Sequence, residues 1–250
     1  MNDVSRETPP ALPETPELVR GVFPSSRMRL IEQYAASLAT DGVVRGLLGP
    51  REVPRLWDRH ILNCVVVGEV IPEGASVCDI GSGAGLPGLV LAIGRPDLRL
   101  TLVEPLLRRT TYLDEMVAEL GLTNVTVRRG RAEELHGKES YDVVTSRAVA
   151  PLDRLLRWSM PLVAPDGALV ALKGSSVGEE IETARPVLRK LGCADPVIVP
   201  VGKAVLDVHT QVVRVAWADP DGVVLGSAKA SKSRRRTKNA FHAGQGRSRS

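Results

Sequence analysis

The chain has 250 residues, 43% of them hydrophobic and 25% charged, which is enough to bury one sizeable core. No apolar run approaches the roughly 20 residues that span a bilayer, and the acidic, proline-rich start at residues 1–16 is unlike a signal peptide. We therefore expect a cytoplasmic protein. Three widely spaced cysteines predict buried thiols rather than a disulfide or a metal site: Cys64, Cys78 and Cys193.

The positive charge is concentrated at the end of the chain. Residues 227–250 contain eight Lys or Arg and no acid, which leaves residues 1–226 with 25 basic against 29 acidic side chains. A segment made largely of Ser, Arg, Lys and Gly cannot bury enough apolar surface to fold, so we expect a disordered basic tail. Two interpretations stay open: an arm that binds RNA phosphates by counterion release, or a solubilising tail without a specific role.

Helical signals come first along the chain. Residues 1–24 are proline-rich and predict a flexible arm. Apolar residues from Met28 to Leu38 recur at helical spacing, after a candidate N-cap at Ser25 and Ser26. Helical spacing returns over 53–70, interrupted near Asp58, and no strand pattern precedes residue 75. The sequence thus predicts an N-terminal helical module at 25–72 in front of a domain at 73–226.

From residue 76 onward strands and helices alternate. We expect helices at 86–93, 106–120, 152–162 and 179–191, and strands at 76–80, 100–104, 125–129, 141–146, 168–173, 197–201 and 210–217. Such alternation predicts crossover connections and a mostly parallel, doubly wound sheet, and the last two strands, with no helix between them, predict an antiparallel addition. An α/β sheet of seven strands in this arrangement is typical of class I methyltransferases that use S-adenosylmethionine (SAM).

The first strand runs into a glycine-rich turn, Asp79-Ile80-Gly81-Ser82-Gly83-Ala84-Gly85-Leu86-Pro87-Gly88. Glycines at a strand end let the backbone approach a nucleotide closely, and the following helix directs free N–H groups at the ligand. Glu104 ends the next apolar run, where a carboxylate meets ribose hydroxyls. Asp79 is expected to orient the loop or to bind the SAM amino group. The D-x-G-x-G-x-G spacing favours SAM; NAD and an ordinary glycine turn remain alternatives.

Four segments carry a closer resemblance: Leu56-Trp57-Asp58-Arg59-His60-Ile61-Leu62-Asn63, the glycine turn, Ser146-Arg147-Ala148 and Leu172-Lys173-Gly174. In this order and spacing they resemble the glucose-inhibited division protein B family, the bacterial 16S rRNA guanine-N7 methyltransferases, over roughly residues 25–217. Residues 49–52 resemble its actinobacterial branch. The resemblance implies methyl transfer from SAM to N7 of a guanine in the 530 loop of 16S rRNA. The expected partner is that rRNA, within the 30S subunit or an assembly intermediate, and nothing in the sequence requires more than a monomer.

The resemblance also suggests cofactor contacts at Gly81, Leu86, Ala132, Glu133 and Arg147. With the residues of the glycine motif, the predicted SAM site comprises Asp79, Gly81, Gly83, Leu86, Glu104, Ala132, Glu133 and Arg147. The predicted substrate-binding residues are Arg59, His60, Arg147 and Lys173.

Several of these positions have a plainer alternative. Glu133 is also explained as a carboxylate favoured by a helix N-terminus. Arg147 is suited to a phosphate, a guanine edge or the cofactor carboxylate, or to a surface ion pair. His60 is either an RNA contact or a structural histidine, and Lys173 contacts either an RNA phosphate or a neighbouring loop.

The expected chemistry needs no catalytic side chain. Guanine N7 attacks through a lone pair and carries no proton, so we predict no general base and no metal, and catalysis by alignment. Three other functions stay open on the sequence alone: a methyltransferase acting on a small molecule, an NAD-linked oxidoreductase, and a non-enzymatic RNA-binding module that retains SAM.

Overall fold

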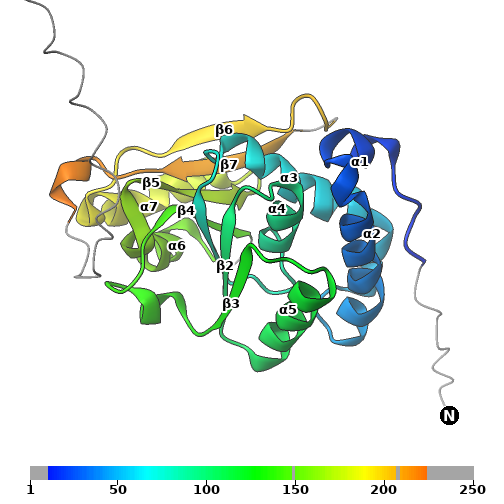
Figure 1. Cartoon of the computed structure of the whole chain (residues 1–250). Helices are drawn as coiled ribbons and strands as arrows, with labels where there is room; N and C mark the ends of the chain where they lie inside the picture. Colours follow the sequence, from blue (N-terminus) through cyan, green and yellow to red (C-terminus); the bar gives the residue numbers. More distant parts are fainter. Residues whose placement is uncertain (1–10, 148–149, 207–208, 224–250) are drawn as a thin grey trace, which may run out of the picture.

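The computed structural model describes residues 11–147, 150–206 and 209–223. Its centre is one seven-stranded sheet in the order β3-β2-β1-β4-β5-β7-β6 (Figure 1). The strands are β1 (Ser76–Ile80), β2 (Arg99–Glu104), β3 (Val125–Arg129), β4 (Tyr141–Arg147), β5 (Val163–Lys173), β6 (Val197–Val201) and β7 (Thr210–Val215). Only β7 runs against the others, since it pairs antiparallel with both β5 and β6. The predicted mostly parallel α/β sheet with an antiparallel addition is confirmed.

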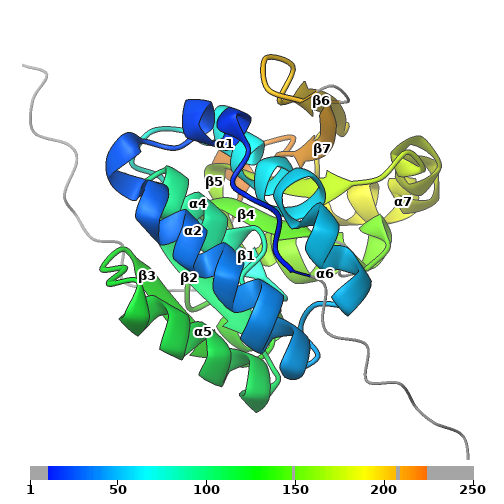
Figure 2. The same ribbon diagram turned by 90° about the vertical axis from the view of Figure 1, so that its right-hand side faces the viewer.

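Helices cover both faces of the sheet (Figures 1 and 2). One face carries α1 (Glu17–Val22), α2 (Met28–Ser37), α3 (Asn63–Val65), α4 (Gly88–Gly94) and α5 (Leu107–Glu119), and the other carries α6 (Leu152–Ser159) and α7 (Val177–Leu191). Side chains alternate between the two layers along each strand: Val77 belongs to the first hydrophobic cluster and Cys78 to the second. This alternation explains why the strands read as continuous apolar runs.

The predicted helical module shares its core with the sheet. Residues 25–72 are helical over most of their length, including π-helical turns at Leu38–Gly42 and Leu56–Leu62 and 3-10 turns at Pro50–Arg55 and Val66–Val70. Their buried side chains belong to the same cluster as those of α4 and α5. The module therefore forms one layer of the fold.

The prediction of a flexible arm up to residue 24 is wrong for its second half. Helix α1 lies within it, and Val19 and Phe23, four residues apart, are both buried. The indole nitrogen of Trp57 also donates a hydrogen bond of 3.0 Å to the Pro13 carbonyl. These two apolar anchors, one within α1 and one directly after it, outweigh the proline-rich composition. Residues 1–10 and the predicted basic tail lie outside the described residues.

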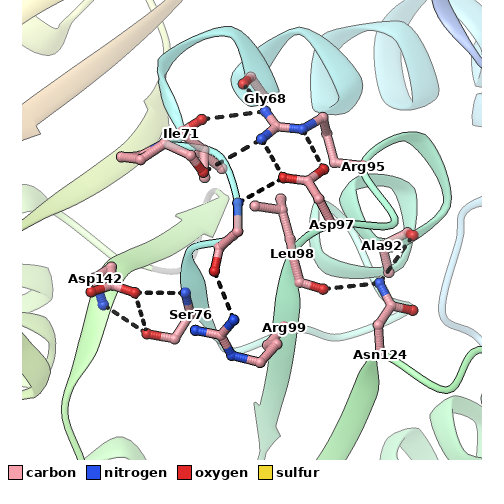
Figure 3. A network of polar contacts seen from close by, with 12 residues as sticks. Gly68, Ile71, Ser76, Ala92, Arg95, Asp97, Leu98, Arg99, Asn124 and Asp142 are labelled. Carbon is pink, nitrogen blue, oxygen red and sulfur yellow. Dashed lines mark hydrogen bonds and ion pairs between the residues drawn. The ribbon is translucent and has the colours of Figure 1, made fainter. Parts of the chain in front are cut away.

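A network of polar contacts closes the amino-terminal edge of the strands (Figure 3). Arg95 donates to the Asp97 carboxylate at 2.7 and 2.8 Å and to the Gly68 carbonyl at 2.8 Å. Asp142 on β4 accepts from the backbone and the hydroxyl of Ser76, at 2.8 and 2.7 Å. The side chain of Arg95 thus ties the end of the helical layer to the loop before β2.

Two smaller expectations also concern this architecture. Cys64 and Cys78 are buried free thiols, as predicted, whereas Cys193 is a free thiol that is only half-buried. Burial raises the pKa of the Cys64 thiol to about 12. Within the described ranges, no helix is both long and apolar enough to cross a membrane.

Candidate functional site

The glycine-rich turn forms a tight cradle at the carboxyl end of β1. Gly81, Gly83 and Gly85 have φ of +68°, +59° and +96°, a region that L side chains rarely adopt. A Cβ on Gly85 would lie 2.5 Å from Cδ1 of Leu89, so glycine is also needed there for space. The backbone N–H groups of Gly81 and Ser82 donate to the Val103 carbonyl, which fixes the turn over the end of β2.

Asp79 supplies an unfilled acceptor below this cradle. Its side chain is fully buried; Oδ2 accepts from the Gly88 N–H at 3.0 Å, whereas Oδ1 has no hydrogen-bond partner among the described residues. Burial raises the pKa of this carboxyl to about 7. A buried carboxylate oxygen beside a glycine cradle suits a ligand that brings a cationic donor. The amino group of SAM is such a donor, so the residues present fit this cofactor.

Glu104 lies against the cradle at the end of β2. Its carboxylate is 1% exposed and accepts from the Gly83 N–H at 3.1 Å and from the Leu106 N–H at 3.0 Å. Arg109 of α5 approaches the same carboxylate at 3.5 Å. Glu104 therefore holds the glycine turn against the start of α5, and its expected contact with ribose stays a prediction.

The remaining predicted cofactor residues differ in their exposure. Leu86 is buried and belongs to the hydrophobic core, so a cofactor contact there has to come from its backbone. Ala132 is buried and Glu133 exposed, in a 3-10 turn (Ala132–Leu135) that follows β3. Glu133 lies in the first turn of that segment, which is compatible with both interpretations given above.

Tyr34 is a site residue that the sequence analysis missed. It lies on α2, is fully buried, and donates a hydrogen bond of 2.7 Å to the Ala84 carbonyl inside the glycine turn. Burial raises its pKa well above the usual value, so the phenol stays protonated as the donor. The sequence did offer a sign of this role, because a tyrosine among the apolar residues of a predicted helix face has a buried hydroxyl that needs a hydrogen-bond partner.

A pocket of about 920 Å³ opens beside the carboxyl ends of β4 and β5. It is lined by Arg59, Asn63, Arg147, Ala150, Pro151, Leu172, Lys173, Gly174, Ser175, Glu180, His209, Thr210 and Gln211. The structure thus brings together three of the four predicted substrate-binding residues. In one wall of the pocket, two residues far apart in the sequence are joined: the Thr210 hydroxyl donates a hydrogen bond of 2.6 Å to Oδ1 of Asn63.

Arg147 lies between the glycine cradle and this pocket. The parallel register pairs Asp79 with Thr145, which places Arg147 level with Gly81 on the neighbouring strand. The fourth predicted substrate residue, His60, does not line the pocket but contacts Arg147: Nη1 of the arginine is 2.8 Å from Nδ1 of the imidazole. His60 and Arg59 come from the π-helical turn Leu56–Leu62, a type of helical irregularity often found at functional sites.

Lys173 contacts protein groups at the pocket wall. Its side chain is 7% exposed, and its ammonium group donates to the Ala150 carbonyl and to Oε2 of Glu180, both at 2.7 Å. The same Glu180 oxygen accepts from the N–H of Leu152 at the start of α6. Of the two interpretations of Lys173, the structure shows the contact with a neighbouring loop, and contact with an RNA phosphate stays a prediction.

Comparisons with known proteins agree on one family. Residues 27–205 match the family model described as "rRNA small subunit methyltransferase G". A protein of Nocardioides sp. named ribosomal RNA small subunit methyltransferase G is 58% identical over 97% of this chain and 95% of its own length. One of the same name from Streptomyces avermitilis is 54% identical over 90% and 94%.

A solved structure resembles the fold. TYW2 of M. jannaschii in complex with AdoMet has a TM-score of 0.51 and 19% identity, over 64% of this chain and 76% of its own. At that identity the likeness concerns the arrangement of strands and helices alone.

Proposed function

Because the chain belongs to the rRNA small subunit methyltransferase G family and is a SAM-dependent rRNA methyltransferase, we propose that it methylates N7 of a guanine in the 530 loop of 16S rRNA. The observation that carries this proposal is the position of Arg147, between the glycine cradle and the pocket. A base in the pocket would meet the cofactor site directly beside this arginine. We further propose that the protein acts as a monomer on the 30S subunit or an assembly intermediate.

The pocket lining suits a purine. Guanine presents two acceptors on one edge, O6 and N7, and arginine is the usual donor to that edge. A hydrogen bond from Arg147 or Arg59 to O6 orients the base and leaves the N7 lone pair free. Among the described residues that line it there is no Phe, Tyr or Trp, so the His209 imidazole and the planar guanidinium groups offer the stacking surface. The aromatic side chains of Trp57 and Tyr112 are buried in the core.

The mechanism requires alignment rather than proton transfer. Bound SAM supplies a methyl group already activated by its sulfonium. The chain contributes the rigid cradle, the anchoring carboxylate Asp79 and the neighbouring pocket; such fixed geometry can lower a barrier by roughly 7–11 kcal/mol. Positive charge develops on the purine during transfer, and oxygen acceptors near the base would compensate it. N7 carries no proton, so no side chain has to accept one.

A small-molecule methyltransferase is the second candidate, and the pocket volume is what favours it. About 920 Å³ lies within the range of roughly 300–1,000 Å³ of ordinary small-molecule sites. A metabolite would not need the basic tail. Membership of a methyltransferase family excludes the alternative of an NAD-linked oxidoreductase.

The deciding experiment incubates the full-length protein with methyl-labelled SAM and 30S subunits from a strain that lacks the enzyme. Nucleosides of the 16S rRNA are then mapped, and free 16S rRNA is treated in parallel. Label recovered as 7-methylguanosine in the 530 loop is the expected result. Label at another nucleotide would refute the proposed target, and SAM binding without label in either RNA would favour the small-molecule alternative.

We also propose that residues 227–250 bind RNA phosphates. Deleting them should weaken RNA binding and reduce the slope of log K against log salt by about 0.7–0.9 for each phosphate that the segment neutralises. The SAM affinity should not change, because every predicted SAM contact lies at or before Arg147. An unchanged salt slope would identify the segment as a solubilising tail.

A further inference from the structure

Three side chains form a continuous chain of contacts behind the pocket. Oε2 of Glu52 is 2.8 Å from Nε2 of His60, and Nδ1 of His60 is 2.8 Å from Nη1 of Arg147. Glu52 comes from the 3-10 turn Pro50–Arg55, His60 from the π-helical turn, and Arg147 from the end of β4. Only the last of these lines the pocket.

The contacts fix the position of the histidine proton. An arginine guanidinium has donors and no acceptor, so Nδ1 of His60 has to accept the hydrogen bond from Arg147. A neutral imidazole that accepts at Nδ1 carries its proton on Nε2, and that N–H faces the Glu52 carboxylate. All three groups are satisfied only when His60 is neutral in this one tautomer.

The surroundings favour that neutral form. His60 is 7% exposed, and burial is the main cause of its lowered pKa. The charged groups that face it are Arg147 from β4, Arg59 from its own turn and Glu52 from the turn before; both arginines lower the pKa, whereas Glu52 raises it. Two further groups interact electrostatically with Arg147: Tyr34 of α2, an uncharged phenol because burial raises its pKa, and Asp79 of β1, whose carboxyl pKa burial raises to about 7.

We propose that Glu52 and His60 are positioning residues that hold the Arg147 guanidinium at the pocket, and that substrate binding by Arg147 requires neutral His60. This inference rests on the proposed function, since it assigns the substrate contact to Arg147. A proton on Nδ1 removes the acceptor for Arg147 and places two cations side by side. The guanidinium then leaves its position, and methylation of rRNA falls as the pH drops through the pKa of His60.

The first test needs no RNA. Long-range ¹H–¹⁵N correlation spectra of the full-length protein report which ring nitrogen of each histidine carries the proton, and the spectrum of His60→Asn identifies the His60 signals. We expect a neutral ring protonated at Nε2 at pH 7 and a pKa below the ordinary 6.5. A proton on Nδ1 at pH 7 would overturn the proposal even if no RNA is ever methylated.

The second test follows kcat/KM for 30S subunits from pH 5 to 8 at saturating SAM. The acid limb is the part of this profile in which kcat/KM falls as the pH is lowered. Replacing Glu52 by glutamine keeps an acceptor for Nε2–H but removes the charge that raises the His60 pKa, so the acid limb of the profile should move to lower pH. The matched control is Asp58→Asn, which removes the same charge from an exposed carboxylate in the π-helical turn that carries His60. It should leave the limb in place.

Two substitutions of the histidine separate positioning from packing. In His60→Asn the side-chain oxygen can still accept from Arg147 but cannot titrate, so the part of the acid limb that is due to His60 should disappear, whereas any part due to Asp79 should remain. His60→Leu fills similar space without an acceptor, and kcat/KM should fall by about tenfold relative to His60→Asn. His136→Asn, at a histidine bound to the Trp158 carbonyl away from the pocket, controls for general effects.

The outcomes are distinguishable from failure of the proposed function. Absence of methylation by every variant, including the unsubstituted protein, refutes the proposed function, while the spectra still decide the state of His60. Methylation with an acid limb that Glu52→Gln does not move, or with equal rates for His60→Asn and His60→Leu, refutes the positioning role.

Discussion

The two ends of the parallel strands, called here the amino-terminal and carboxyl edges, differ in how completely their carboxylates are paired. At the amino-terminal edge, the Asp97 carboxylate accepts hydrogen bonds from the Arg95 guanidinium and from the Gly74 N–H. The hydrogen bonds from Arg95 lower the pKa of that carboxyl to about 2. At the carboxyl edge, Asp79 keeps one oxygen without a partner among the described residues, and burial raises its pKa to about 7. The paired Asp97 carboxylate stabilises the amino-terminal edge, whereas the unpaired oxygen of Asp79 leaves the carboxyl edge able to bind a ligand.

The largest expected effect comes from closing the cradle. In Gly85→Ala the new Cβ meets Leu89 at 2.5 Å and Tyr34 at 3.0 Å on a backbone with φ of +96°. SAM affinity, measured by calorimetry, should fall by about a hundredfold or more. The control lies at the other edge: Gly74 also has positive φ but no atom within 4 Å of an added Cβ. Gly74→Ala should cost about 1–2 kcal/mol of stability and no SAM affinity. Equal SAM affinities would show that the cradle is misassigned.

The next effect concerns the arginine between the cradle and the pocket. Arg147→Lys keeps the charge but loses the planar fork that can both donate to His60 and reach a base. We expect rRNA methylation, as kcat/KM, to fall by about tenfold to a hundredfold. Arg128→Lys, at an exposed arginine on the edge strand β3, is the matched control and should stay near the unsubstituted rate. A similar loss in both variants would point to general electrostatics instead.

A smaller effect is expected from Tyr34→Phe. The substitution leaves the buried Ala84 carbonyl without its donor, which costs about 1–3 kcal/mol, and it loosens the turn that binds SAM. SAM affinity should fall about five- to tenfold. Tyr112→Phe removes the contact of a neighbouring buried phenol with Ser37, outside the glycine turn. That control should lower the melting temperature without weakening SAM binding; a loss of SAM affinity in both variants would contradict a specific role for Tyr34.

The smallest effect belongs to the amino-terminal edge and leaves function intact. A lowered carboxyl pKa stabilises the fold fully above the ordinary value near 3.9, and this stabilisation disappears as the pH falls towards about 2. Asp97→Asn should therefore lower stability at pH 7 by about 1 kcal/mol, a shift in melting temperature of roughly 2–4 °C. The difference from the unsubstituted protein should vanish in acid. A changed SAM affinity would show that the two edges are not independent.

The sequence was sufficient for features that are encoded locally. Alternating apolar runs predicted the strands and their order of appearance, and the spacing of glycines predicted the cradle. Arg147 was expected at a strand end, and it is there. Each of these depends on a few neighbouring residues.

The features that escaped prediction depend on contacts across the chain. Tyr34 and Ala84 are 50 residues apart, and His60 and Arg147 are 87 apart. A sequence shows that a buried hydroxyl or imidazole needs a partner but not which partner the topology supplies. Helix α1 escaped for a related reason, because its anchors act only once the core of the other helices exists.

The hydrogen bond between Thr210 and Asn63 joins residues 147 positions apart, so this wall of the pocket forms only after the ribosome has reached β7. Every predicted SAM contact lies at or before Arg147, whereas Lys173, Glu180 and the start of β7 complete the pocket. A nascent chain therefore acquires its cofactor residues well before it acquires the walls that receive a substrate. The segment from β5 to β7 sets the moment at which a newly made molecule becomes competent. A ribosome thus has to finish most of this chain before the product can act on ribosomal RNA.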